Sequence, residues 1–317
     1  MKKYIKAIYF LFMGALLCGC SNQSAAGWYV SPGGDDLAEG GKNTPLKTVA
    51  KALEYALPGD TVFLREGAYH EFVIPTRSGE PGKAITIKSY PGETAKIDGT
   101  GLKLEGWSAL VQLRDIQHLT LEDLHICNAV NASPNSDPEG ILINGKSGDI
   151  TIRNCKIYNI KSVCLDTHGK DDWRSAHAIL VLGTNDETPI RNLTIEQCEI
   201  FDMHTGTSES LTIAGNVDGF VVRDCEVHDV ENIGIIVAGG DNLNPGGDIK
   251  VNYARNGIVR RNKVYRCTHQ YTPEFWEVVC NNPAAASPGA APGACPAAVP
   301  IPVSFRERSF TGISPCS

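Results

Sequence analysis

Three ionisable side chains stand at the same point of a repeated sequence pattern. Glu139, His177 and Glu209 each directly precede the first small residue of one copy. If the copies stack in register, the three side chains form a row with about 4.8 Å between neighbours. A His between two carboxylates has a raised pKa and suits general acid–base chemistry. The two carboxylates would lie about 9–10 Å apart, near the separation in inverting glycosidases. The alternative is a polar ladder at a corner of the fold.

The row depends on an internal repeat. Apolar residues alternate with polar ones in short pieces, separated by turns rich in Gly, Asn and Asp, which indicates short strands. Five copies begin at Ala109, Gly140, Ala178, Ser210 and Gly234. Their equivalent positions form apolar columns, which are Leu121, Ile152, Ile195, Val222 and Val259, and Ile126, Ile157, Ile200, Val227 and Val264.

Repeats of this length, with three short strands and no helix in each, predict an all-β solenoid, a right-handed parallel β-helix. Each copy would be one coil, and the columns would become apolar ladders inside it. We expect this domain to cover residues 28–267. A β-sandwich also has many short strands, but it does not repeat side-chain columns.

One column contains thiols. Cys155, Cys198 and Cys225 occupy equivalent positions. Zinc sites usually contain paired C-x-x-C units, which this column lacks, so we expect a ladder of buried thiols. Stacked coils also aim their side chains in parallel, which disfavours disulfides between them.

An amphipathic helix is predicted before the coils. Thr44 is the expected N-cap and Pro45 the first helical residue, and apolar residues follow at helical spacing as far as residue 57. The open end of a solenoid exposes apolar side chains and unpaired strand edges. We therefore expect this helix to cap the first coil.

A resemblance to secreted bacterial right-handed β-helix proteins is carried by the stretch YVSPGGDD…TPLKTVAKALEYALPGDTVFLREGAYHE, followed by KAITIKSYPGETAKIDG. These proteins include polysaccharide lyase family 9 and related pectate-lyase-like proteins. The resemblance covers about residues 28–267. It implies a carbohydrate polymer bound along a groove on one face. It also implies Ca²⁺ held by clustered Asp residues, and a Lys that acts as base.

An insertion between the second and third coils, SVCLDTHGKDDWRSAH, offers residues for that chemistry. Asp166, Asp171 and Asp172 would supply part of the six to eight oxygen ligands that Ca²⁺ takes. Lys170 or Arg174 would be the base that removes the proton alpha to a uronate carboxylate. The family's Asp cluster lies within the coils, whereas this one lies in a loop. A solvated polar loop is therefore the alternative.

The N-terminus predicts export. Three lysines among the first six residues precede an apolar run over residues 7–17, as in a signal peptide. The following LCGC, which ends at Cys20, resembles a bacterial lipoprotein box. It implies a signal peptide over residues 1–20, lipidation of Cys20 and a tether over residues 21–27. The expected location is the cell envelope, on the outer membrane or cell surface. A plain secretory leader and a secreted protein are the alternative.

Residues 268–317 lack the coil pattern, and residues 282–302 are rich in Ala and Pro. This composition indicates an irregular tail. Solenoids normally end in a shielding cap, so we expect a truncated or frame-altered C-terminus.

Composition limits the partners. The 317 residues are 42% hydrophobic, which is ample for a core, and the net charge is −7. Loss of the three leader lysines would change it to −10. This argues against nucleic acid as a ligand. An acidic polysaccharide remains compatible, because a bound cation or a basic patch can invert the local field. We expect a monomer.

Three classes of function remain open. The first is an enzyme acting on an extracellular polysaccharide, foremost a lyase of a uronate-containing polymer, or else a glycoside hydrolase that uses the carboxylate pair. The second is a non-catalytic glycan-binding or adhesive surface lipoprotein, in which substitution of Glu209 or Asp172 would leave binding intact. The third is a structural remnant without activity.

Overall fold

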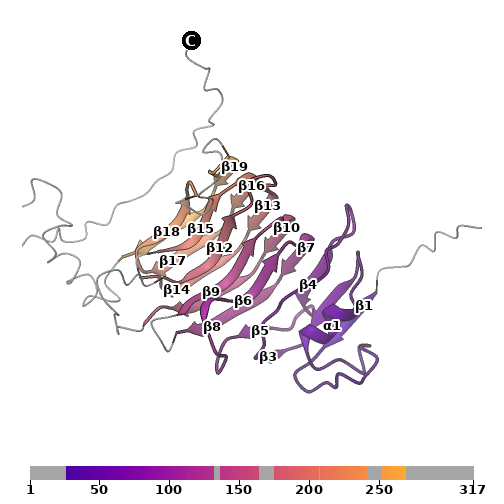
Figure 1. The fold of residues 1–317 in the computed structure, drawn as a ribbon. Helices are drawn as coiled ribbons and strands as arrows, with labels where there is room; N and C mark the ends of the chain where they lie inside the picture. Colours follow the sequence, from indigo (N-terminus) through magenta and orange to yellow (C-terminus); the bar gives the residue numbers. More distant parts are fainter. Residues whose placement is uncertain (1–25, 132–135, 164–174, 207, 241–250, 269–317) are drawn as a thin grey trace, which may run out of the picture.

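The computed structural model describes residues 26–131, 136–163, 175–206, 208–240 and 251–268. These residues form twenty strands in three parallel sheets and one short helix. Figure 1 shows the strands stacked coil upon coil along one axis. The predicted signal peptide, Cys20 and nearly all of the predicted tail lie outside the described residues. Within the described part of the chain, no helix is long and apolar enough to cross a membrane.

From β6 (Gly106–Arg114) onward, successive coils add one strand to each of three sheets, whereas the strands before β6 belong to the first two sheets only. The first sheet contains β1 (Gly27–Val30), β2 (Thr61–Leu64), β4 (Ile85–Ser89), β7 (Gln117–Glu122), β10 (Gly148–Arg153), β13 (Ile190–Glu196), β16 (Val217–Arg223) and β19 (Arg255–Arg260). The second contains β3 (Gly67–Tyr69), β5 (Ala95–Asp98), β8 (Leu124–Val130), β11 (Lys156–Lys161), β14 (Glu199–His204), β17 (Glu226–Val230) and β20 (Lys263–Cys267). The third contains β6 (Gly106–Arg114), β9 (Ser136–Asn144), β12 (His177–Gly183), β15 (Glu209–Gly215) and β18 (Ile233–Val237).

The predicted columns are confirmed in register, and the first of them is buried as far as Val222, whereas Val259 is 45% exposed. Leu121 pairs with Ile152, Ile152 with Ile195, and Ile195 with Val222 in neighbouring strands of the first sheet. All four side chains are fully buried. The second apolar column is likewise in register across β8, β11, β14, β17 and β20. The thiols of Cys155, Cys198 and Cys225 are free and buried, as expected for a core ladder.

A single left-handed residue makes the corner between the first and second sheets. Asp123, Asn154, Gln197, Asp224 and Arg261 occupy this corner in successive coils, with φ between 51° and 58°. Asn and Asp tolerate this conformation better than most residues. Their side chains also bond between coils, and the Asn154 amide donates to the Asp123 carboxylate. The polar corner of the repeat is therefore a backbone requirement.

Helix α1 (Val49–Tyr55) lies beside β1 and β2 at the N-terminal end of the stack (Figure 1). Its buried residues join the core, as expected of a cap. The predicted start was wrong, because Thr48 is the N-cap and not Thr44. The Leu46 backbone instead bonds to β1, which keeps the preceding residues extended. The Glu71 carboxylate accepts from the first two helical N–H groups.

Substitution of Thr48 should separate the two capping assignments. The Thr48 hydroxyl accepts from the Lys51 backbone N–H at 3.1 Å. Thr48→Ala is expected to lower the free energy of unfolding by about 1 kcal/mol, the usual effect of losing an N-cap. Thr44→Ala is the matched control and should change it by less than about 0.5 kcal/mol. Urea unfolding measures both, and a larger loss in the Thr44 variant would contradict the capping assignment.

Candidate active site

The outer face of the third sheet carries the predicted row. Glu139 pairs with His177 across β9 and β12, and the pairing of β12 with β15 places Glu209 on the other side of His177. These side chains face outward because the strand changes its alternation just after them. Ala178 and Ile179 are consecutive, yet both lie in the core. Strict alternation from Ile179 would have turned His177 inward.

The three side chains form a connected chain of contacts. The His177 Nδ1 atom lies 2.9 Å and 3.1 Å from the two carboxylate oxygens of Glu139. On its other side, the Nε2 atom lies 3.9 Å from Oε2 of Glu209. The Thr212 hydroxyl donates to that same oxygen at 3.0 Å. The structure thus brings the three predicted residues together, and their catalytic role stays a prediction.

Exposure differs along the row. The Glu139 side chain is 0% exposed, whereas 8% of the His177 side chain and 19% of the Glu209 side chain are exposed. Glu139 can therefore act on a ligand only through His177. A His whose Nδ1–H donates to a buried carboxylate is held in one tautomer, with Nε2 left to accept a proton.

Burial and charge shift both pKa values. Burial raises the pKa of Glu139 to about 7, although the neighbouring His177 opposes this shift. Burial disfavours a charge on His177 as well, but the carboxylate of Glu139, followed by that of Glu209, outweighs it and raises the His177 pKa. The pair consequently holds a proton more firmly than isolated Glu and His side chains would, as expected of an acid–base centre.

The same shifts predict how stability depends on pH. Glu139 and His177 both bind protons more tightly in the folded chain than in the unfolded chain. The stability that this pair contributes is therefore present at low pH, and it is lost as the pH rises from the unfolded pKa values through the folded ones. Between about pH 5 and pH 8, the free energy of unfolding should fall more steeply in the wild type than in a Glu139→Gln/His177→Gln double variant. Urea unfolding at several pH values measures the difference, and parallel curves would contradict it.

A small cluster of buried apolar residues adjoins the row on the same face. Leu142, Leu180, Leu182 and Ala214 form a cluster separate from the main core, together with Ala109, which pairs with Glu139. Leu142 pairs with Leu180, and the next residue in that column is Thr212. Ligand sites generally combine an apolar lining with a few polar groups.

The second predicted site is the Asp- and Lys-containing insertion between the second and third coils. Asp166, Lys170, Asp171, Asp172 and Arg174 all fall in residues 164–174, outside the described residues. Among the residues that the structure describes, no group of three or more His, Cys, Asp or Glu side chains is arranged to hold a metal ion. The Ca²⁺ site and the Lys170 or Arg174 base therefore stay predictions.

Sequence reasoning missed two residues of the row's surroundings. Thr212 holds Glu209, and the charge of Asp137 raises the pKa values of both Glu139 and His177. Thr212 could have been singled out from the sequence, because it is the polar member of a column that contains Leu142 and Leu180. Asp137 gave no such signal, because it precedes the repeated segment.

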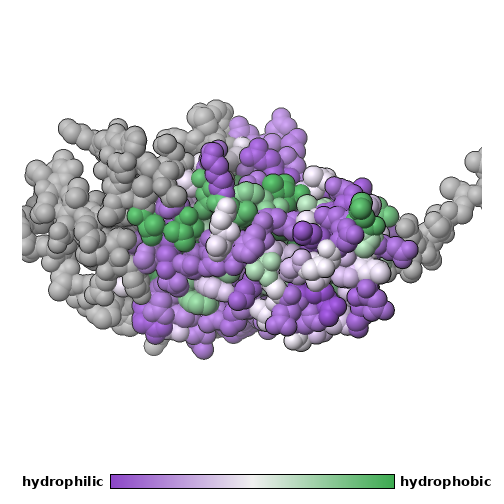
Figure 2. Space-filling view, turned by 90° about the horizontal axis from the view of Figure 1, so that it is seen from below, coloured by the Kyte–Doolittle hydropathy of each residue, from purple (hydrophilic) through white to green (hydrophobic). Residues whose placement is uncertain are grey.

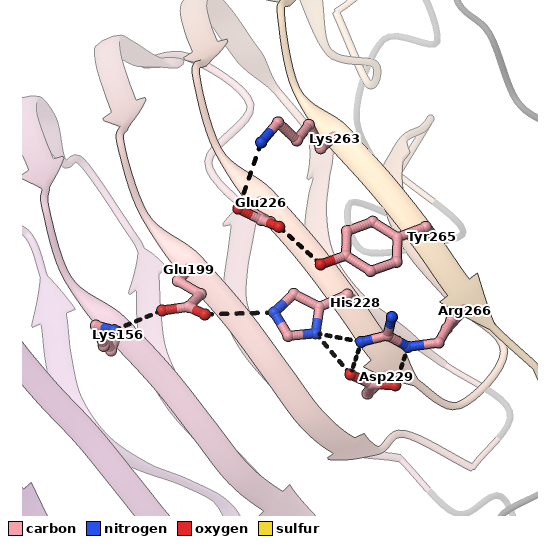
Figure 3. A network of polar contacts seen from close by, with 8 residues as sticks. All are labelled: Lys156, Glu199, Glu226, His228, Asp229, Lys263, Tyr265 and Arg266. Carbon is pink, nitrogen blue, oxygen red and sulfur yellow. Dashed lines mark hydrogen bonds and ion pairs between the residues drawn. The ribbon is translucent and has the colours of Figure 1, made fainter.

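A second His with two carboxylate neighbours lies on the outer face of the second sheet (Figure 3). His228 Nδ1 is 2.7 Å from Asp229, and Nε2 is 3.4 Å from Glu199. Here, however, Arg266 pairs with Asp229 and Lys156 pairs with Glu199. These cations lower the pKa values of both carboxylates. The network is best explained as ion pairs that link neighbouring coils.

The surrounding surface agrees with that interpretation. Figure 2 views the molecule from below, the side on which β3, β5 and β8 lie in Figure 1. Hydrophilic residues dominate this view, and hydrophobic ones form separate patches. Rings stack across coils of the second sheet, with centroids 4.9 Å apart for Tyr158 and Phe201 and 5.5 Å apart for Phe201 and His228. Their faces contact one another and are not free for a sugar.

The stacked coils, the one-residue corners and the outward acid–base row define a parallel β-helix protein with a candidate active site on one sheet. Residues 28–230 match the family model described as "Pel9A-like, right handed beta helix region". The chain belongs to this family. The match confirms both the right-handed fold and the resemblance to pectate-lyase-like proteins.

Two curated relatives are similar in sequence. The chain is 34% identical over 230 residues to "Uncharacterized protein YwoF" of Bacillus subtilis. The aligned region covers 72% of this chain and 46% of the relative. It is 38% identical over 80 residues to "Pectate lyase PEL9" of Emericella nidulans. Here the aligned region covers 25% of this chain and 20% of that protein. The chain thus spans less than half the length of either relative.

Two solved structures align with part of the chain. The GH136 lacto-N-biosidase of Eubacterium ramulus is 17% identical with a TM-score of 0.45, over 77% of this chain and 52% of that one. Pectate lyase Pel9A is 12% identical with a TM-score of 0.43, over 65% of this chain and 55% of that one.

Proposed function

We propose that this protein acts on an extracellular polysaccharide, as a lyase of a uronate-containing polymer with His177 as the base. One observation carries the proposal. A buried carboxylate, that of Glu139, fixes Nδ1 of His177 while Nε2 points towards the partly exposed Glu209. Membership of the Pel9A-like family and the similarity to a protein named pectate lyase support the choice of substrate.

In the proposed reaction, Nε2 of His177 takes the proton from the carbon alpha to the uronate carboxylate. The electron pair of that C–H bond forms a carbon–carbon double bond while the bond to the leaving sugar oxygen breaks. That oxygen takes up a proton from solvent. Glu139 stabilises the imidazolium that forms, as the carboxylate does in a Ser-His-Asp triad. Ca²⁺, for which Asp166, Asp171 and Asp172 are proposed, would neutralise the substrate carboxylate.

Hydrolysis is less well supported by the row. A hydrolase needs two carboxylates that both reach the glycosidic bond. Glu139 is wholly buried and bonded to His177, so only Glu209 is placed to contact a sugar. This geometry suits one His base with a supporting carboxylate better than an acid pair.

A panel of uronate polysaccharides, incubated with the protein with and without EDTA, tests the reaction. We expect new ultraviolet absorbance from an unsaturated uronate, and its loss on EDTA treatment if Ca²⁺ takes part. Reducing ends without this absorbance would indicate a hydrolase. Binding without either product, by protein shown to be folded, would indicate a glycan-binding protein and would refute catalysis.

A further inference from the structure

A hollow of about 320 Å³ opens on the same outer face as the row, over β6, β9 and β12. Its walls include Gln112, Arg114, Asp115, Leu142, Asn144 and Leu182. Gln112 pairs with Leu142 and Arg114 with Asn144 across β6 and β9, while Asn144 pairs with Leu182 across β9 and β12. The hollow is thus built on three successive strands, which fix its shape.

Its floor is apolar and its rim is polar. Leu142 and Leu182 belong to the apolar cluster of this face and are 6% and 5% exposed. Gln112, Arg114 and Asn144 stand beside them in the same two outward columns. An apolar floor with a few convergent polar groups is the usual composition of a site for a small organic ligand.

The rim groups are available to a ligand. Within the described part of the chain, the side chains of Gln112, Arg114 and Asn144 make no hydrogen bond or ion pair. Arg153 on the first sheet, by contrast, pairs with Glu122 in the neighbouring coil. The Asp115 carboxylate beside the hollow already accepts from the Lys146 backbone N–H at 2.7 Å.

We infer that this hollow is a subsite for one uronate unit of a bound polymer, with Arg114 pairing with the uronate carboxylate. The inference rests on the proposed function and adds the residues that would select an acidic sugar. A guanidinium binds a carboxylate through two parallel hydrogen bonds, which a Lys cannot reproduce. The leucine floor packs against the apolar face of the ring, and the Gln112 and Asn144 amides bond to its hydroxyl groups.

The distance between the hollow and the row sets the minimum length of a ligand that contacts both. Arg114 lies five residues along β6 from the position that pairs with Glu139. At about 3.3 Å per residue, this separates the subsite from the row by roughly 10–17 Å along the strand direction. A ligand that contacts both is therefore an oligomer, in which the bond to be cleaved and the selected carboxylate belong to different sugar units.

Binding of a short oligouronide to the full chain tests the subsite, with the methyl-esterified oligomer as the uncharged probe. Arg114→Gln is expected to weaken calorimetric binding of the acidic oligomer about tenfold or more, and Arg114→Lys should restore it only in part. Binding of the ester should change little in either variant. Arg260→Gln, which removes an exposed Arg of β19 on the first sheet, is the matched control and should bind both oligomers like the wild type.

The outcomes separate this inference from the proposed reaction. Equal binding of the acidic oligomer by wild type and Arg114→Gln, or no binding by the wild type, would overturn the subsite. Lyase turnover that persists unchanged in Arg114→Gln would overturn the subsite and leave the proposed function standing. Selective binding through Arg114 without turnover would support the subsite and refute catalysis.

Discussion

Replacing His177 by Gln is expected to lower turnover of a uronate polymer by about 10²–10⁴-fold, the usual contribution of a general base. Gln has nearly the volume of His and retains an amide N–H that can donate to Glu139, so the fold should persist. It has no basic nitrogen to accept the proton that Nε2 would take. Ultraviolet absorbance of the product measures turnover, and urea unfolding shows that the variant is folded.

The other His with two carboxylate neighbours provides the control. His228→Gln, on the outer face of the second sheet, removes an imidazole that lies between Glu199 and Asp229. It should leave turnover within about twofold of the wild type, because its carboxylates are already paired with Arg266 and Lys156. Loss of turnover in His228→Gln with full activity in His177→Gln would place the reaction on the other sheet.

The pH profile adds a second readout for His177. A base works only when deprotonated, so turnover should fall as pH drops through its pKa. The Glu139 and Glu209 carboxylates raise that pKa above the usual 6.5 for His. The acidic limb of the profile should therefore lie above about pH 6.5. An acidic limb that lies below about pH 6.5 would contradict His177 as the base.

The repeat was the most predictable part of the fold. Columns such as Leu121, Ile152 and Ile195 follow from the sequence because each coil must bury the same face against the one before it. The polar corners were visible too, since Asn and Asp are favoured where φ is positive. The helix start was missed because Thr44-Pro45 has good capping chemistry locally, while Leu46 pairs with a distant strand.

The site was predictable in its members but not in its geometry. Repeat alignment alone placed Glu139, His177 and Glu209 side by side. It gave no sign that Ala178 and Ile179 both turn inward, and that change of alternation is what puts the row on the outer face. Nor did it show that Glu139 is wholly buried, because aligning repeats gives the order of side chains along a column and not their exposure.

Glu139 is expected to be the most sensitive position of the row for stability. Glu139→Ala removes the partner of a His whose side chain is only 8% exposed, and leaves a cavity beside it. Breaking a buried ion pair from one side typically costs about 3–5 kcal/mol, because the remaining group loses its partner. Glu139→Gln keeps the volume and one acceptor oxygen, so a smaller loss of about 1–3 kcal/mol is expected. Urea unfolding at pH 7 measures both.

The Gln variant also separates a positioning role from a purely structural one. Without the Glu139 charge, the pKa of His177 should fall, since that carboxylate is its main raising influence. The acidic limb of the turnover profile should then move to lower pH while maximal turnover drops, because the imidazolium is less well stabilised. Glu209→Gln is the matched control, because it removes a weaker influence at 3.9 Å and should move the limb less. If Glu139→Gln lost stability but kept the wild-type profile, Glu139 would be a structural residue, and the arrangement that holds His177 would play no part in the reaction.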